Sequence, residues 1–460
     1  MTTSRDHILD PDDLVEAGIR TVIVASPDLT GRLVGRRVPV EGFPRVVEKG
    51  VDVCTCVYAW DVDQSFDVIG NNLLPLCGMH NGVPDVTFRP DLTTLRRAAW
   101  LDGVAVCLAD PCEHHTDELL PISPRTILRN EVGAYDRLGL QPWTGTELEF
   151  FLFKNDPREL RMNGFRGLEP TTLYPSDFMI HEGNVYEPFF QKLRSDLRES
   201  GILMEAAQSE WGTGQWEMTF VYTDPLEMAD RHALYKLAVR DVAAMNGMSV
   251  TFMARPFTDQ AGSSCHVHLS MTDGDGQPAF WDEDGPHHMS RTMNAAIAGV
   301  LEHAPEVMIW YAPTINSYRR SNATDDVAGW GRTWGVDNRT ASVRVVGESP
   351  SDLRMELRLP GADTNPYLTL TGLLASARDG IERGLQAPPE TTGNAYLEPH
   401  DPDMPRLLHE ATAVWAASDF TRQQWGQEIV DHFRVMAEHE SRVFHATVSD
   451  WDLHRYFDRI

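Results

Sequence analysis

The clearest indication of the fold is the segment Thr146-Glu147-Leu148-Glu149-Phe150-Phe151-Leu152-Phe153. Its apolar and aromatic residues predict a β-strand. Because Glu147 and Glu149 are two residues apart, both carboxylates point to the same face of that strand. Two like charges side by side repel each other unless a cation lies between them. The stretch is therefore either a solvent-facing strand or one wall of a cation site.

A second acidic pair follows in segment 210–218. Glycines separate Glu210 from Glu217, and a tight turn at Thr213-Gly214 predicts a hairpin. Such a turn would place the two glutamates opposite each other, with Cβ atoms roughly 5 Å apart. The alternative is an exposed hairpin tip.

Two later segments add histidines and arginines in the same alternating pattern. His266 and His268 alternate with apolar residues and share one strand face, although a single buried histidine is commonly structural. Arg354, Glu356 and Arg358 also share a face, which fits either a salt-bridged surface strand or the wall of an active site.

The combined set has a chemical logic. Five carboxylates and one or two histidines are the ligands that hard divalent cations prefer, and the absence of thiolates argues against structural zinc. Nearby arginines suit phosphates and carboxylates. Divalent cations with arginines are the equipment of phosphoryl transfer. The sequence has no G-x-x-x-x-G-K-[ST] loop, so a nucleotide must be held in another way.

Composition excludes several other classes. The chain has 460 residues, with 68 acidic and 40 basic ones, giving a net charge of −28. Such an acidic surface does not favour nucleic acid or anionic lipid. No apolar run approaches the roughly 18 residues of a membrane span, and the N-terminus has no apolar signal core. The six cysteines form no Cys-x-x-Cys pair and are expected to be reduced and mostly buried, as in a cytoplasmic protein.

The order of predicted elements indicates an α+β chain. Strands are expected at 21–25, 33–40 and 51–57, and the proline-rich stretch 110–125 is a plausible domain boundary. Helices are expected at 188–201, 226–246, 292–304 and 370–385, and over much of the last 60 residues. This gives a small β-rich domain followed by a large mixed one.

Read in order, these motifs resemble the glutamine synthetase family along nearly the whole chain. Each motif alone is moderately specific, but six or more in register leave little room for accident. They are Asp28-Leu29-Thr30-Gly31 with Arg36, Glu147-Leu148-Glu149-Phe150, Glu210 with Gly214-Gln215-Trp216-Glu217, His266-Val267-His268, Asn316-Ser317-Tyr318-Arg319-Arg320, Asn338-Arg339-Thr340-Ala341-Ser342-Val343-Arg344, Arg354-Met355-Glu356-Leu357-Arg358-Leu359-Pro360 and Asn365-Pro366-Tyr367.

The resemblance implies a β-grasp-like N-terminal domain over residues 1–115 and a catalytic α/β domain over residues 116–460. It also implies a homo-oligomer of two stacked rings, commonly a dodecamer, with active sites between neighbouring subunits. ATP, glutamate and an amine would be the substrates, and two or more Mg²⁺ or Mn²⁺ ions would be bound per site.

Site residues follow from the resemblance position by position. Glu149, Glu210 and Glu217 correspond to ligands of one metal, and Glu147, His266 and Glu356 to ligands of the second. The remaining positions divide between phosphate and amino-acid binding. Arg339, Arg344 and Arg354 resemble the phosphate-binding arginines, Ser270 falls near the nucleotide pocket, and Arg320, Arg358 and Gly262 resemble the glutamate-binding residues.

Two differences from the family pattern affect the residues expected to bind glutamate and the amine. Family members that form glutamine carry Asn-Gly-Ser-Gly-Met before the histidine, whereas this chain has Ala261-Gly262-Ser263-Ser264-Cys265. Their flap glutamate is also missing, and Asp325 or Asp326 could replace it as the catalytic carboxylate. The pattern is similar to members that join glutamate to larger amines, with Trp211 and Trp330 facing the amine or packing in the core. The alternatives are an ordinary glutamine synthetase and a non-catalytic regulator derived from the family.

Overall fold

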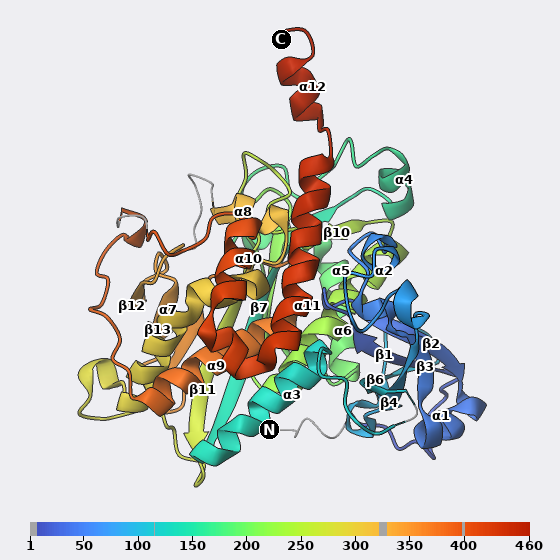
Figure 1. Ribbon diagram of the computed structural model, residues 1–460, viewed down its shortest axis with the longest axis horizontal. Coiled ribbons are helices and arrows are strands. Elements are labelled where there is room, and N and C mark those ends of the chain that lie inside the picture. Colours follow the sequence, from blue (N-terminus) through green and yellow to red (C-terminus); the bar gives the residue numbers. More distant parts are fainter. Residues whose placement is uncertain (1–6, 115, 322–328, 398–400) are drawn as a thin grey trace.

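The computed structural model describes residues 7–114, 116–321, 329–397 and 401–460. Within these residues, a smaller sheet near the N-terminus lies beside a larger sheet covered by helices, as Figure 1 shows. The α+β architecture predicted from the sequence is confirmed. Among the described helices, none has the length and apolar character of a membrane span.

The smaller sheet has the order β2-β1-β6-β4-β3, with β5 paired to β6. Strands β1 and β6 are parallel, and the other pairs are antiparallel. The β1–β2 turn depends on Gly31, whose φ of 81° favours glycine, and on Asp28, which accepts hydrogen bonds from Thr30 and Arg32. The strands are β1 (Thr21–Pro27), β2 (Leu33–Pro39), β3 (Val51–Cys54), β4 (Asp85–Pro90), β5 (Arg96–Arg97) and β6 (Val104–Glu113).

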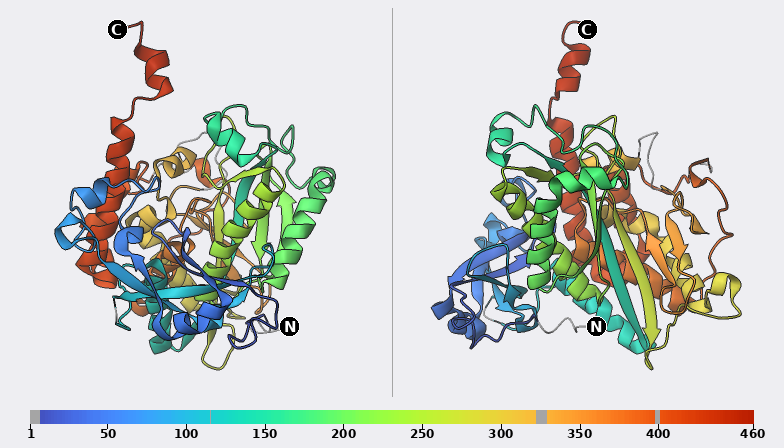
Figure 2. Two further views of the ribbon diagram at one scale, coloured as in Figure 1. Left: turned by 90° about the vertical axis from the view of Figure 1, so that its right-hand side faces the viewer. Right: turned by 180° about the vertical axis from the view of Figure 1, so that it is seen from behind.

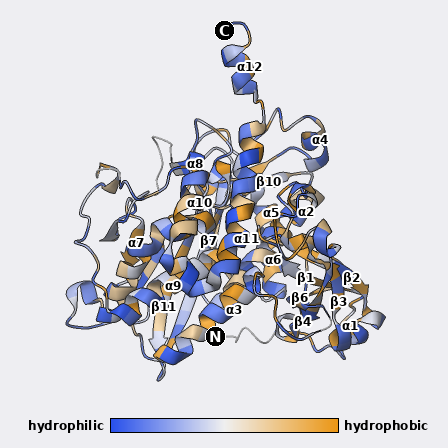
Figure 3. Cartoon of the chain, in the orientation of Figure 1, coloured by the Kyte–Doolittle hydropathy of each residue, from blue (hydrophilic) through white to orange (hydrophobic). Residues whose placement is uncertain are grey.

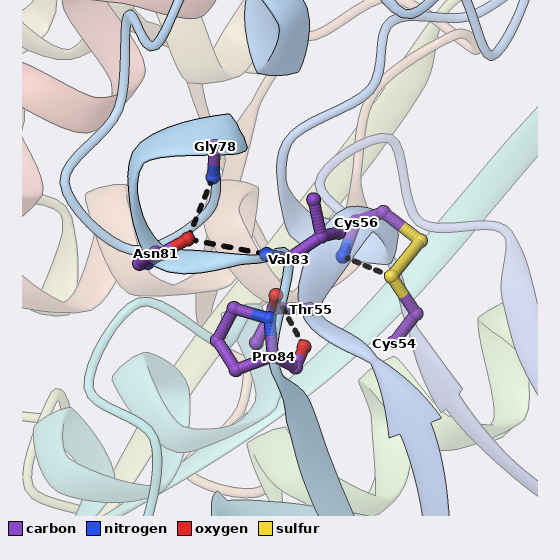
Figure 4. The surroundings of a disulfide bond; sticks show 7 residues. All are labelled: Cys54, Thr55, Cys56, Gly78, Asn81, Val83 and Pro84. Carbon is purple, nitrogen blue, oxygen red and sulfur yellow. Dashed lines mark hydrogen bonds between the residues drawn. A yellow bond between two sulfur atoms is a disulfide. The ribbon is translucent and has the colours of Figure 1, made fainter.

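The third predicted strand is shorter than expected, because β3 ends at Cys54 and a 3-10 helix begins at Thr55. At this point Cys54 and Cys56 form a disulfide, next to the hydrogen bond from Thr55 to Pro84 (Figure 4). The prediction of reduced thiols is therefore wrong for this pair. The strand-to-helix turn brings their Cα atoms to 5.2 Å, within bridging range, although one residue separates them. Free, buried thiols are found at Cys77, Cys107, Cys112 and Cys265.

The larger sheet has the order β12-β13-β14-β11-β7-β9-β8, with β10 paired to one end of β7. The long strand β7 is its centre, and β11 and β9 pair with it antiparallel on either side. The strands are β7 (Leu140–Phe153), β8 (Met204–Ser209), β9 (Gln215–Phe220), β10 (Ser249–Thr251), β11 (Cys265–Asp273), β12 (Trp334–Val336), β13 (Val343–Val346) and β14 (Arg354–Leu357).

Helices cover one face of this sheet, and Figure 2 shows its strands from the other side. Leu148, Phe150 and Leu152 of β7 point into the helix-covered core, so alternation places Glu147 and Glu149 on the opposite face. The helices are α1 (Phe43–Lys49), α2 (Asp67–Gly70), α3 (Pro124–Ala134), α4 (Pro157–Met162), α5 (Ile180–Glu199), α6 (Pro225–Met245), α7 (Arg291–Tyr311), α8 (Ile315–Ser321), α9 (Pro366–Arg383), α10 (Leu408–Ala417), α11 (Asp419–Ala446) and α12 (Asp450–Tyr456).

The predicted helices are all present, but two are longer than expected. Helix α5 begins at Ile180, eight residues before the predicted start at Pro188, because its first turns are exposed and lack an apolar period. Helix α7 continues to Tyr311 through Pro305. Figure 3 shows apolar residues concentrated in the central helices and strands, whereas α12 projects from the body and is mostly hydrophilic.

A buried ion-pair network joins the two sheets. Arg125 of α3 is 1% exposed and contacts Asp91 and Asp110 of the N-terminal part and Asp230 of α6. Tyr367 of α9 donates a hydrogen bond to Asp230 over 2.7 Å. Because a buried charge is costly without partners, this network fixes the N-terminal sheet against the helices that support the larger one.

Candidate active site

The registers of four neighbouring strands bring the predicted acids and histidine together. Glu147 of β7 lies opposite His266 of β11, and Glu149 of β7 lies opposite Glu217 of β9. Glu356 of β14 lies opposite His268, one pleat along β11 from His266. Ligand atoms of Glu147, His266 and Glu356 lie within 4.8 Å of one another, and so do those of Glu149, Glu217 and His266.

The predicted hairpin exists, but its register differs from the expectation. Gln208 of β8, not Glu210, lies opposite Glu217. The turn takes all of residues 210–214, because the Glu210 amide bonds to the Gln215 carbonyl and Gly214 adopts a φ of 79°. Glu210 nevertheless reaches the site, since the Gln208 side-chain amide donates to both Glu210 and Glu217 over 3.1 Å.

Several carboxylates of this cluster lie close together where little solvent reaches them. Burial raises the pKa of Glu149 and of Glu217 well above the usual range, and neighbouring carboxylates raise both further. Burial likewise raises the pKa of Glu210 to about 7. Buried carboxylates so close together are the donor set that hard divalent cations require, so the residues present fit Mg²⁺ or Mn²⁺.

The other two acids are held ionised by hydrogen bonds from histidines and by a neighbouring arginine. Burial alone would raise the pKa of Glu147, but hydrogen bonds with His266 and His268 outweigh it and lower that pKa below the usual range. Glu356, also buried, has a pKa of about 2 because His266 and Arg358 lie beside it. The charges of Glu147 and Glu356 are therefore balanced by neighbouring side chains, whereas the charges of the other three acids are not.

Supporting residues hold this arrangement, and among them the sequence singled out His268 but not Gln215. Gln215 donates to the Glu149 carboxylate and to the Gly262 carbonyl, each over 2.9 Å. The Ser264 amide also donates to Glu149. His268 contacts Glu147 over 2.9 Å and Arg354 over 3.1 Å. Both Gln215 and His268 lie within motifs described above, and those positions were the sequence signal for their supporting roles.

Most of the predicted arginines surround the cluster. Arg344 and Arg358 both pair with Glu356. Buried Arg320 donates to the Ser264 hydroxyl over 2.7 Å, and a Cβ atom at Gly262 would lie only 2.6 Å from its side chain. Residue 262 therefore has to be glycine, because a larger side chain would clash with Arg320.

Four predicted residues lie farther out or outside the described chain. Arg339 is exposed on the connection between β12 and β13, and Ser270 is half-buried on β11 beyond His268. Asp325 and Asp326 lie outside the described residues.

The two tryptophans differ. Trp330 packs edge-on against Tyr318 and donates to the Pro405 carbonyl, which supports the core-packing alternative. Trp211 is 60% exposed next to Glu210.

A model of the glutamine synthetase catalytic domain matches residues 121–456. The chain belongs to the glutamine synthetase family. It is 38% identical to a gamma-glutamylethanolamide synthetase of Streptomyces coelicolor, covering 97% of this chain and 95% of that protein. It is 33% identical to a glutamate–isopropylamine ligase of a Pseudomonas species, covering 99% of each. The family member also superimposes on a solved GmaS–ADP complex with a TM-score of 0.85, at 25% identity over 98% of this chain and 100% of that one. The predicted membership, and the resemblance to the branch that joins glutamate to amines, are confirmed.

Proposed function

We propose that this family member is an ATP-dependent ligase that joins the γ-carboxylate of glutamate to an organic primary amine. The observation that carries the proposal is a cluster of five acids and a histidine flanked by arginines, in a chain whose sequence departs from the family pattern on the amine side. A non-catalytic regulator would be expected to lose such ligands, because uncompensated buried carboxylates are destabilising.

Two metal positions fit the cluster. Glu149, Glu210 and Glu217 would hold one ion, and Glu147, His266 and Glu356 the other, with His266 between the two sets. Divalent ions bound there neutralise the charge between ATP and the glutamate carboxylate, which otherwise repel each other.

The arginines then divide into two groups. Arg344 and Arg354, with Ser270 farther along β11, lie on the side proposed for the ATP phosphates, and Arg339 would reach the transferring phosphoryl group from the strand connection. On the glutamate side, Arg320 and Arg358 would bind the carboxylates, with Gly262 offering its backbone.

The reaction would proceed in two steps. A γ-carboxylate oxygen of glutamate attacks the γ-phosphorus of ATP, and ADP leaves. The neutral amine nitrogen then attacks the acyl carbon, the C–O bond to phosphate breaks, and phosphate leaves. The nitrogen loses a proton to a carboxylate, for which Asp325 or Asp326 is our candidate.

Several further properties remain proposals. We infer a β-grasp-like N-terminal domain that ends near residue 115, a catalytic domain from residue 116, and a stacked-ring homo-oligomer with active sites between subunits. A cytoplasmic location is also a prediction. An ordinary glutamine synthetase remains the second candidate, because the metal and phosphate residues do not distinguish the two activities.

The test is phosphate release with ATP, glutamate and Mg²⁺ across a panel of primary amines, with the amide product identified by mass. We expect release to require all four components. Release that continues without glutamate, or with the metal chelated, contradicts the proposal.

A further inference from the structure

A short turn before α5 places a carboxylate next to Glu210. The Phe178 amide donates to the Ser209 carbonyl over 3.1 Å, and the Ser209 hydroxyl donates to the Ser176 carbonyl over 2.6 Å. Ser209 is the last residue of β8 and directly precedes Glu210. These two hydrogen bonds therefore hold Asp177 beside the end of the strand that leads into the metal cluster.

The backbone at this turn is strained. Phe178 has a φ of 56°, a left-handed conformation that a bulky residue rarely adopts. Strain of this kind persists where the surrounding structure imposes it, and it is concentrated at functional sites. Here it accompanies the placement of the preceding side chain, Asp177.

Asp177 is half-buried, and one oxygen of its carboxylate has no hydrogen-bond donor among the described residues. Its Oδ1 is covered by neighbouring atoms and accepts no hydrogen bond from any described residue. Its charge contributes to the raised pKa of Glu210, and Arg339 favours its ionised form. A covered acceptor atom without a donor, on a carboxylate that interacts with both a metal-ligand candidate and a phosphoryl-binding candidate, suits a cationic or N–H-bearing ligand.

Exposed apolar side chains lie on the same two segments. Trp211 follows Glu210, and Phe178, 58% exposed, follows Asp177. The segments run side by side, since Gly214 also donates to the Thr172 hydroxyl over 2.6 Å. A carboxylate next to exposed aromatic faces suits a molecule with an amino group at one end and an alkyl chain at the other.

We propose that Asp177 binds the amino group of the organic amine and that Trp211 contacts its alkyl chain, so that these two residues determine amine specificity. This inference rests on the proposed function. It adds Asp177, which the sequence motifs did not include because segment 171–179 has no periodic pattern, and it assigns Trp211 the amine-facing alternative.

The test compares Asp177→Asn, Asp177→Glu and Trp211→Ala with wild type and with Glu169→Gln, an exposed change on the same connection. The measurements are KM for ethylamine, glutamate and ATP, and the rate of ADP formation without amine. We expect Asp177→Asn to raise the KM for ethylamine on the order of 10- to 100-fold, with glutamate and ATP within about twofold. Asp177→Glu should restore part of the loss. Trp211→Ala should reduce the preference for propylamine over methylamine about tenfold.

Each other outcome has a distinct meaning. If wild type uses ammonium and no organic amine, the proposed function fails and takes this inference with it. If wild type uses ethylamine but Asp177→Asn leaves its KM unchanged, the inference is wrong and the function stands. If Asp177→Asn slows amine-independent ADP formation as much as the complete reaction, Asp177 orients Arg339 and does not bind the amine.

Discussion

Replacing Glu210 with glutamine should stabilise the metal-free protein and abolish its activity. Burial raises the pKa of Glu210 to about 7 from 4.5, and the charges of Asp177 and Glu147 add to the effect. In the folded, metal-free state at neutral pH and above, ionised Glu210 is therefore unfavourable. Glutamine keeps the shape, and its Oε1 atom can still accept the hydrogen bond from Gln208, but the negative charge is gone.

The magnitude follows from the pKa. Raising a pKa from 4.5 to about 7 corresponds to about 3 kcal/mol of folding free energy at high pH, and we take about 2 kcal/mol because solvent still reaches this side chain. Between pH 4.5 and about 7 the folded state keeps a proton that the unfolded chain has released, so stability rises as the pH falls through this window. The advantage of Glu210→Gln should therefore be present at about pH 8 and nearly absent at about pH 4.5.

Thermal unfolding in chelator measures this difference. With an unfolding entropy of about 1 kcal/mol per kelvin for 460 residues, 2 kcal/mol shifts the Tm by about 2 °C. Saturating Mg²⁺, at about 100 times its Kd, should stabilise wild type by about 2.7 kcal/mol and the variant by less. Glu205→Gln, an exposed change on β8, the strand that leads to Glu210, is the matched control. If Glu210→Gln is no more stable than wild type at about pH 8 in chelator, or if it turns over ATP normally, the reasoning is refuted.

Three further variants test other parts of the account. Arg339→Lys keeps the charge but loses the planar guanidinium, so we expect kcat to fall on the order of 100-fold in steady-state assays, and an unchanged kcat would place Arg339 outside the reaction. Gln215→Leu removes one of the two donors to Glu149 and the side-chain donor to the Gly262 carbonyl, so Mn²⁺ titration should show affinity weakened about 10- to 100-fold, and equal affinity would argue against this support. Arg125→Met removes the arginine shared by three aspartates and leaves buried Asp230 with no cationic partner among the described residues but Asp91 and Asp110 with Arg129, so calorimetry should show a loss of about 3–5 kcal/mol, and a neutral effect would mean that the network is dispensable.

The strand faces of the site were predictable from the sequence because the alternation is local. Glu147 and Glu149 share a face whatever the rest of the chain does, and so do His266 and His268. The order of the motifs then identifies the family. The two-residue period of a regular strand is therefore enough to assign these side chains to the correct face.

Features that depend on turns or distant contacts were not predictable. The position of Glu210 depends on a five-residue turn rather than a tight one, which moved Gln208 opposite Glu217. Asp177 is presented by an irregular segment that hydrogen bonds from Ser209 and Gly214 hold in place. The partners of Arg125 come from three separate regions of the chain, and no local pattern indicates that they meet.

A competition assay measures whether the enzyme prefers an organic amine to ammonium. The enzyme is given glutamate, ATP and Mg²⁺ with ammonium and a primary amine at equal concentrations of their neutral forms, and mass spectrometry measures the ratio of the two amide products. That ratio equals the ratio of kcat/KM values, and we predict that at least one alkylamine, polyamine, ethanolamine or aniline exceeds ammonium by about tenfold or more, about 1.4 kcal/mol. If glutamine predominates against every amine, the protein is an ordinary glutamine synthetase with an altered amine side.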